Sequence, residues 1–299
     1  MSGALVANIF VLGLSRKCGK TLVASALVKG LLDNNVKAGF IKPLSLVDTY
    51  LNLAAISRSA DLGFPVSMEA VQLSEVDPSL DYDVVNPLVL VSAPPRLETF
   101  LEARTPSTYF AYLDDPFKRI FFVKASFPQS IKMRLGYLYE WLLSRRLVYV
   151  DDEMLRKISR NVDKVIKIGA HIDVESFLRE IISKAVWEAY ERLSERRRVL
   201  IVEGVFDRAW PLPFYLRPDI VFIVAQGSVL MFSGDRYAAA VKVKGDYSDM
   251  SVLRTRDVIA LLNPSTIFHV PPLSTFELIE SRVEKLSEVV GAVLDFIES

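Results

Sequence analysis

The sequence is poor in the residues that build covalent or zinc-bound frameworks. It contains one cysteine, Cys18, and two histidines, His171 and His269. An intrachain disulfide is therefore excluded, and the scarcity of thiols is typical of a reducing compartment, so we expect a cytoplasmic location. A zinc site is not expected, because such sites take their ligands from sets of cysteine and histidine.

Long apolar runs and an excess of one charge are also missing. No uncharged apolar run approaches the roughly 20 residues of a membrane span, and the first apolar stretch lacks the basic segment of a signal peptide. Lys+Arg and Asp+Glu both number 36, so no global field favours a nucleic acid or an anionic membrane as a partner. The three arginines at 196–198 end a predicted helix, which favours a solvated helix end over an anion site.

Apolar residues, by contrast, are abundant. They make up 51% of the chain and the mean hydropathy is +0.27, as expected when a parallel sheet is buried on both faces. Short apolar runs alternate with patterns of helical spacing, which predicts an α/β fold with a mostly parallel, doubly wound sheet. The predicted strands are 7–12, 36–43, 198–204, 219–225 and 266–272, and the predicted helices are 22–32, 48–60, 152–160, 173–195, 252–262 and 274–296.

The clearest motif lies between the first predicted strand and the first predicted helix. It runs from Gly13 to Gly19-Lys20-Thr21, with five residues between the glycines. Strand, glycine turn and helix form the setting of a phosphate-binding loop, because N–H groups at a helix N-terminus point at the anion. Lys20 would reach the β- and γ-phosphates and Thr21 would bind Mg²⁺. The alternative is a chance Gly-Lys-Thr in a strand-to-helix turn.

Two charged residues at predicted strand ends extend this candidate site. Lys42 is followed by Pro43, which cannot continue a central strand, and Glu203 ends another apolar run. Ligands of open α/β sheets bind at the carboxyl ends of the strands. An acid in that place binds a metal or orients water in phosphate-loop enzymes, and an ordinary charged strand end is the alternative.

The segment 104–169 differs in character, because aromatic and basic residues are interleaved there without any repeat. Such a pattern can bind nucleic acid, but its periodicity favours the core of a small α/β subdomain. We therefore predict a nucleotide-binding domain at 1–103 and 170–299, with 104–169 as an inserted subdomain. Its neighbour 84–95 holds three prolines and is interpreted as an extended lining segment, and 229–243 as a hairpin.

Several of these pieces occur together, in the same order, in one family. They are the Gly13 to Thr21 loop, Lys42-Pro43, Val85-Asn86-Pro87 with Ala93-Pro94, Ile172-Asp173 before a helix, and Val202-Glu203-Gly204. In these motifs the chain resembles the dethiobiotin synthetase family of deviant P-loop ATPases. The segment 104–169 has no counterpart in that family.

The resemblance implies an ATP- and Mg²⁺-dependent enzyme, ligase-like or kinase-like and usually a homodimer, that phosphorylates a carboxyl or carbamate group of a small molecule. It implies catalytic roles for Lys20 and Lys42. Metal binding would come from Thr21, Asp48 and Glu203, with Asp61 or Asp207 as alternatives to Asp48. The implied nucleotide-binding residues are Gly13, Lys17, Cys18, Gly19, Lys20, Thr21 and Leu22.

The first half of the loop departs from that family. Leu14-Ser15-Arg16-Lys17 stands where the family typically carries Thr-Asp-Thr-Glu, so a hydroxyl and a cation replace two acids. With Lys42 nearby, these cations predict a basic substrate side that prefers an acidic or phosphorylated molecule. Alternatively, Arg16 and Lys17 face solvent or pair with acids of a dimer mate. A nucleotide-dependent switch that docks a protein partner is a second hypothesis from another class of function.

Overall fold

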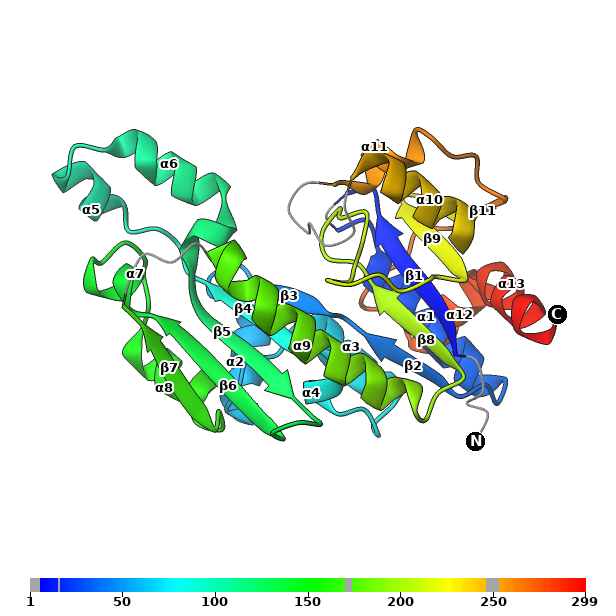
Figure 1. Cartoon of the computed structure of the whole chain (residues 1–299), viewed down its shortest axis with the longest axis horizontal. Coiled ribbons are helices and arrows are strands. Elements are labelled where there is room, and N and C mark those ends of the chain that lie inside the picture. The colour runs from blue at the N-terminus through cyan, green and yellow to red at the C-terminus, as the bar shows by residue number, and fades with distance from the viewer. Residues whose placement is uncertain (1–5, 16, 170–173, 246–252) are drawn as a thin grey trace. The chain divides into compact units, whose positions relative to one another are not determined.

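The computed structural model describes residues 6–15, 17–169, 174–245 and 253–299 (Figure 1). The chain divides into two compact units. The first comprises Met1–Pro43, Gln72–Val85 and Ala189–Ser299, and the second comprises Leu44–Val71 and Asn86–Glu188. Two helices, α3 (Met68–Val76) and α9 (Val174–Ser194), contribute residues to both units.

The first unit is built on a six-stranded sheet with the order β2-β8-β1-β9-β10-β11. The four strands from β2 to β9 are parallel, and β10 and β11 each add an antiparallel pairing. Both faces of the parallel part are buried, which is why those strands are almost continuously apolar. The strands are β1 (Ala7–Gly13), β2 (Ala38–Ile41), β8 (Val199–Glu203), β9 (Ile220–Ala225), β10 (Ser228–Ser233) and β11 (Thr266–His269).

The helices of the first unit pack on this sheet and on one another. Helix α1 (Lys20–Asp33) contacts β1, β2 and β8, and it also packs against α12 and α13. A Cβ atom at Gly30 would lie 2.9 Å from both methyl groups of Val290, so this glycine permits the close approach of α1 and α13. The other helices are α4 (Tyr82–Val85), α10 (Gly234–Lys244), α11 (Thr255–Ile259), α12 (Ile279–Lys285) and α13 (Ser287–Glu298).

The second unit has a sheet of its own, with five strands in the order β3-β4-β5-β6-β7. The outer pairs β3/β4 and β6/β7 are parallel, and β5 runs antiparallel to both of its neighbours. Consequently β3, β4, β6 and β7 end at the edge where β5 begins. The strands are β3 (Leu44–Asp48), β4 (Leu88–Ser92), β5 (Ile120–Phe127), β6 (Met133–Tyr139) and β7 (Lys164–Ile168).

Short helices surround the second sheet. Helix α2 packs against α8 and β3, and Ala55 of α2 joins Val47 and Val89 in a buried cluster. Beyond the end of β4, α5 and α6 form a pair in which no residue of α6 is buried (Figure 1). The helices are α2 (Leu53–Leu62), α5 (Leu97–Glu102), α6 (Pro106–Asp114), the 3₁₀ helix η1 (Pro116–Arg119), α7 (Glu140–Ser144) and α8 (Asp152–Ser159).

The α/β class expected from the sequence is confirmed, and the strands form two mixed sheets, one in each unit. The second unit also extends beyond the expected insertion at 104–169, since it begins at Leu44. The reason is strand pairing: β3 and β4, which precede that segment, form the same sheet as β5 and β6.

Two of the expected elements were wrong. The segment 84–95 contains a central strand, β4, because Pro87 and Pro94 lie outside its ends and leave all its N–H groups available. The segment 229–243 is not a hairpin. Strand β10 pairs with β9 and β11, and the following residues form α10, whose buried Tyr237, Ala238 and Val241 have helical spacing.

A third segment, 48–60, begins with the last residue of β3 and a turn rather than with a helix. The Asp48 carboxylate accepts hydrogen bonds from the N–H groups of Tyr50 and Leu51, at 3.0 and 3.2 Å, and this turn separates β3 from α2. Aspartate favours such turns because its side chain competes for nearby backbone donors. The helix therefore starts at Leu53.

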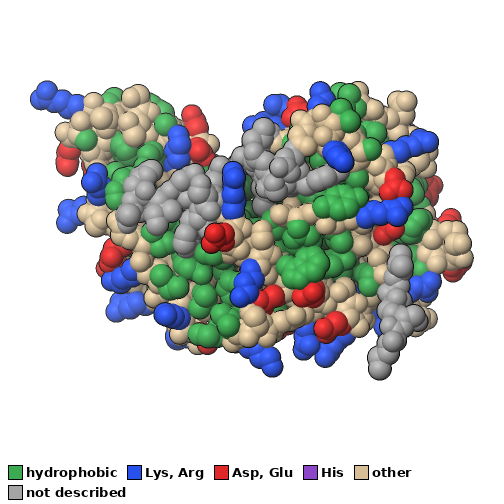
Figure 2. Space-filling model, in the orientation of Figure 1, with side chains coloured by type: hydrophobic (Ala, Val, Ile, Leu, Met, Phe, Trp, Pro, Cys, Tyr) green, Lys and Arg blue, Asp and Glu red, His purple; other side chains and the backbone are tan. Residues whose placement is uncertain are grey.

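The surface reflects the equal numbers of acidic and basic residues. On the face shown in Figure 2, Lys and Arg side chains are interspersed with Asp and Glu side chains. Within the described ranges, no helix is both long enough and apolar enough to cross a membrane.

Candidate functional site

The candidate site in the first unit begins with the 14–19 loop, between β1 and α1. The Leu14 N–H donates to the Val224 carbonyl at 3.2 Å, which ties the start of the loop to β9. At its end, Gly19 has φ 99° and serves as the N-cap of α1. Lys17 also has a positive φ, 58°, which is uncommon for a residue with a side chain. Arg16 lies outside the described residues.

The loop packs closely on the last residue of β1. A Cβ atom at Gly13 would lie 2.4 Å from Cys18 Sγ and 2.9 Å from Lys20 Nζ. Any other residue at position 13 would therefore displace the cysteine or the lysine. Cys18 and Lys20 are both buried, so the cysteine fills space inside the loop.

The start of α1 offers backbone donors to an anion. The helix has no side-chain N-cap and no acidic residue in its first turn. Its first N–H groups therefore keep their partial positive charge. Beside them, Lys20 Nζ donates to the Ser15 carbonyl at 3.4 Å and lies 3.9 Å from Cys18 Sγ. Among the described residues, this ammonium contacts a carbonyl through a long hydrogen bond and a thiol, and no carboxylate.

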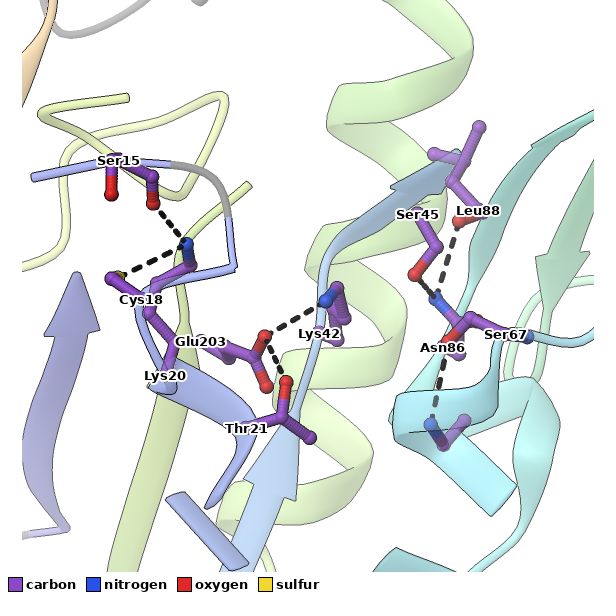
Figure 3. A network of polar contacts seen from close by, with 11 residues as sticks. Ser15, Cys18, Lys20, Thr21, Lys42, Ser45, Ser67, Asn86, Leu88 and Glu203 are labelled. Atoms are coloured by element: carbon purple, nitrogen blue, oxygen red, sulfur yellow. Dashed lines mark hydrogen bonds and ion pairs between the residues drawn. The ribbon is translucent and has the colours of Figure 1, made fainter. Parts of the chain in front are cut away.

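Three sequence-predicted residues meet at the carboxyl edge of the sheet. Thr21 Oγ1 donates to Glu203 Oε1 at 2.9 Å, and Lys42 Nζ donates to the same oxygen at 2.8 Å (Figure 3). Glu203 is 1% exposed and Lys42 6%. The meeting follows from topology, because β8 lies between β1 and β2 in parallel register and all three strands end together.

The second carboxylate oxygen of Glu203 has a different environment. Oε2 is buried and has no hydrogen-bond partner among the described residues. Gly204 holds the acid in place, since its N–H donates to the Val11 carbonyl at 2.9 Å and a Cβ there would lie 2.7 Å from Leu12 Cδ2. A buried acceptor without a donor fits a cation or a cation-bound water.

No cluster of three or more His, Cys, Asp or Glu side chains able to hold a metal occurs within the described ranges. This does not conflict with a magnesium site, because Mg²⁺ keeps several waters and commonly takes one or two carboxylates plus phosphate oxygens. The residues present, a threonine hydroxyl and a carboxylate with an unpartnered oxygen, fit such an ion.

Asp48, the other predicted metal residue, belongs to the second unit and already has partners there. Its Oδ2 accepts from Arg119 Nη1 and from Ser92 Oγ, both at 3.0 Å, while Oδ1 accepts the two backbone N–H groups described above. A metal ion at Asp48 would have to displace one of these donors. Its role as a metal ligand stays a prediction.

Another residue of the motifs that carry the resemblance, Asn86, forms hydrogen bonds within the second unit. Asn86 Nδ2 donates to Ser45 Oγ at 3.0 Å, and its Oδ1 accepts from the Ser67 N–H at 3.4 Å (Figure 3). Asn86 is fully buried, so it fixes the chain before β4. Ile172-Asp173 lies outside the described residues. The two alternatives to Asp48 belong to different units. Asp207 pairs with Arg254 in the first unit, and Asp61 belongs to α2 in the second.

Sequence reasoning missed Arg119 altogether. Arg119 is 6% exposed, and its guanidinium pairs with Asp48, which lies far away in the chain. Neither residue belongs to a motif, and only strand pairing brings them together.

Neither family models nor curated proteins nor solved structures include a match to this chain.

Proposed function

We propose that the first unit binds ATP at the 14–19 loop and that the chain is an Mg²⁺-dependent P-loop enzyme resembling dethiobiotin synthetase. The observation that carries this proposal is the meeting of Thr21, Lys42 and Glu203 at the start of α1, where no described residue donates to Glu203 Oε2. A threonine hydroxyl bonded to a buried strand-end acid is the pairing that phosphate-loop enzymes use beside the nucleotide.

The proposed phosphate contacts come from backbone and lysine. The uncapped N–H groups at the start of α1 would donate to the β-phosphate, and Lys20 Nζ would exchange the Ser15 carbonyl for the β- and γ-phosphates. A charged phosphate oxygen is a stronger acceptor than a carbonyl at 3.4 Å. The loop residues Gly13, Cys18 and Gly19 would shape the cradle, and Leu22 and Lys17 would border it.

One Mg²⁺ would be held by the Thr21 hydroxyl and Glu203, and it would neutralise charge on the β- and γ-phosphates. Lys42 would keep its hydrogen bond to Glu203 and would direct another N–H of its ammonium at the transferring phosphoryl group. In the proposed reaction a carboxylate or carbamate oxygen of the substrate attacks the γ-phosphorus and ADP leaves, giving a mixed anhydride. Because little covalent chemistry falls to the protein, the two lysines act electrostatically.

The substrate remains a proposal at the level of class. Lys17 is exposed in the loop, so it is available to an acidic or phosphorylated small molecule, whereas Lys42 is paired with Glu203. Homodimerisation and a cytoplasmic location are further predictions of the resemblance and of the thiol content.

The test is ATP turnover by the variant Lys20→Ala, with Lys29→Ala as the matched control. Lys29 lies on the same helix but pairs with Asp33 at its other end, so its loss should leave turnover unchanged. Loss of Lys20 should lower turnover by at least a hundredfold, about 2.7 kcal/mol of transition-state stabilisation. Ordinary turnover by Lys20→Ala would exclude this site. Stimulation by small carboxylates supports an enzyme, whereas stimulation only by a protein favours a switch.

A further inference from the structure

Three buried hydrogen-bond donor atoms of the second unit lack a hydrogen-bond partner among the described residues. They are Thr49 Oγ1, Arg96 Nε and Arg119 Nε. A buried polar group left without a partner costs about 1–3 kcal/mol, so folded proteins normally supply one from the chain, from water or from a ligand. All three atoms donate, and a molecule that satisfied them would have to bring acceptors.

These donors belong to one edge of the second sheet. Thr49 directly follows β3, and Arg119 directly precedes β5, which begins where β3 and β4 end. The Thr49 N–H donates to the Ser92 carbonyl at 2.9 Å, and the Ala93 N–H donates to the Arg119 carbonyl at 3.2 Å. Thr49 and Arg119 are therefore joined through the end of β4. This is the carboxyl edge of four strands, where ligands of α/β sheets commonly bind.

The charge at this edge favours a ligand with a single negative charge. Arg119 is largely neutralised, since its Nη1 lies 3.0 Å from Asp48 Oδ2 and 3.2 Å from the Ala93 carbonyl. These contacts fix the guanidinium and leave Nε as its unused donor. A phosphate dianion would meet the Asp48 charge with little cationic charge left to offset it, whereas a carboxylate brings one charge and two acceptor oxygens.

The surroundings of the edge are apolar and exposed. Tyr50 and Leu51, directly after Thr49, are 64% and 81% exposed, and Leu97 at the start of α5 is 43% exposed. The Arg96 guanidinium lies 4.5 Å from the ring centre of Tyr149. The Tyr149 hydroxyl donates a hydrogen bond to Glu98, and mainly for that reason the Tyr149 pKa is raised.

We propose that this edge of the second unit binds a small monocarboxylate with an apolar chain. The carboxylate accepts hydrogen bonds from Thr49 Oγ1 and Arg119 Nε, and the apolar part lies against Tyr50 and Leu51. The site is independent of the nucleotide, because every residue that forms it belongs to the second unit. A negative result for the proposed ATPase would therefore not affect this proposal, and a negative result here would not affect the ATPase.

The experiment is calorimetric titration of the whole chain with hexanoate, without nucleotide, next to acetate and inorganic phosphate. Hexanoate should bind at least tenfold more tightly than either comparison anion, because acetate lacks the chain and phosphate carries the second charge. Thr49→Val removes the hydroxyl with little change of shape, and Arg119→Lys keeps a cation for Asp48 but removes Nε. Each should weaken hexanoate binding at least tenfold, about 1.4 kcal/mol.

Two controls locate the site. Thr108→Val makes the same exchange on an exposed position of α6, and Lys20→Ala disables the proposed phosphate loop. Both should leave hexanoate binding unchanged, and urea unfolding of each variant verifies that it folds. Absence of hexanoate binding up to about 10 mM would overturn the proposal, and water would then satisfy the donors. Three other results would also overturn the proposal. They are unchanged hexanoate binding by Thr49→Val, tighter binding of phosphate than of hexanoate, and loss of hexanoate binding in Lys20→Ala.

Discussion

Glu203 is the residue on which the candidate nucleotide site depends. One of its oxygens accepts two hydrogen bonds and the other accepts none among the described residues. A carboxylate with 1% exposure is stable only beside a cation, since burying an unpaired charge is strongly unfavourable. Lys42 supplies that cation, so the same pair that we propose for catalysis also stabilises the fold.

We predict that Lys42→Met destabilises the first unit by about 3–5 kcal/mol, because it leaves Glu203 as a buried unpaired charge. The double variant with Glu203→Gln should recover most of this loss, since no charge is then buried. Urea denaturation of the two single variants and the double variant measures the coupling. If the two effects simply add, the ion pair has no role in stability.

At the scale of elements, the long helix α9 is tied to the turn between β5 and β6. The Glu188 carboxylate is 5% exposed and accepts hydrogen bonds from Ser130 Oγ and from the N–H groups of Gln129 and Ser130. Burial by itself would raise the Glu188 pKa, but these hydrogen bonds outweigh it and hold the pKa below its ordinary value of 4.5. The charged form is therefore favoured in the folded state.

This has a consequence for stability in acid. A carboxyl group whose folded pKa is depressed stabilises the protein above its unfolded pKa and loses that contribution as the pH falls through the folded pKa. Wild-type stability should therefore fall from about pH 5 downward, with a part of the loss due to Glu188. In Glu188→Gln the slope should be smaller, as urea midpoints between pH 7 and 3 would show. An equal slope in both proteins would contradict the assignment.

The junction of β9, β10 and α10 depends on a glycine. A Cβ atom at Gly234 would lie 1.8 Å from the Pro218 carbonyl oxygen, and the Gly234 N–H donates to the Asp219 carbonyl at 3.0 Å. Because backbone atoms of Pro218 and Asp219 oppose the methyl group, we predict that Gly234→Ala destabilises the first unit by at least about 2 kcal/mol. Thermal unfolding should show the loss.

The control is Gly291→Ala, in α13. A Cβ atom at Gly291 would meet nothing within 4 Å, so alanine should be neutral there or stabilise the helix by up to about 1 kcal/mol. Similar losses for the two variants would mean that helix propensity and unfolded-state entropy, rather than the close contact with Pro218, decide the effect.

At the scale of the whole molecule, the two sheets are separate and each unit has its own core. A ligand stabilises only the structure that binds it, by about 2.7 kcal/mol at a hundredfold excess over Kd. An ATP analogue with Mg²⁺ should therefore slow amide hydrogen exchange in β1, α1 and β8, and leave β4 to β6 unchanged. An equal gain in both units would show that they open as one cooperative structure.

The sequence by itself determined the local features of the first unit. Apolar runs predicted the parallel strands β1, β2, β8 and β9, because strands buried on both faces need continuous apolar residues. Gly13, Gly19 and the order strand, loop, helix predicted the loop and the start of α1. Lys42 and Glu203 were identified as strand-end residues, because proline follows Lys42 and because Glu203 is the acid that ends an apolar run.

Tertiary structure decided how the strands are shared between sheets. Residues 44–48 and 88–92 contain nothing local that assigns them to a second sheet, since strand partners are chosen by packing between distant segments. The same holds for single contacts. The pairing of Arg119 with Asp48 exists only once the second sheet is assembled. The same holds for the atoms that have no partner among the described residues, Oε2 of Glu203 and the buried donors at Thr49 and Arg96, because burial removes the water that would otherwise satisfy them.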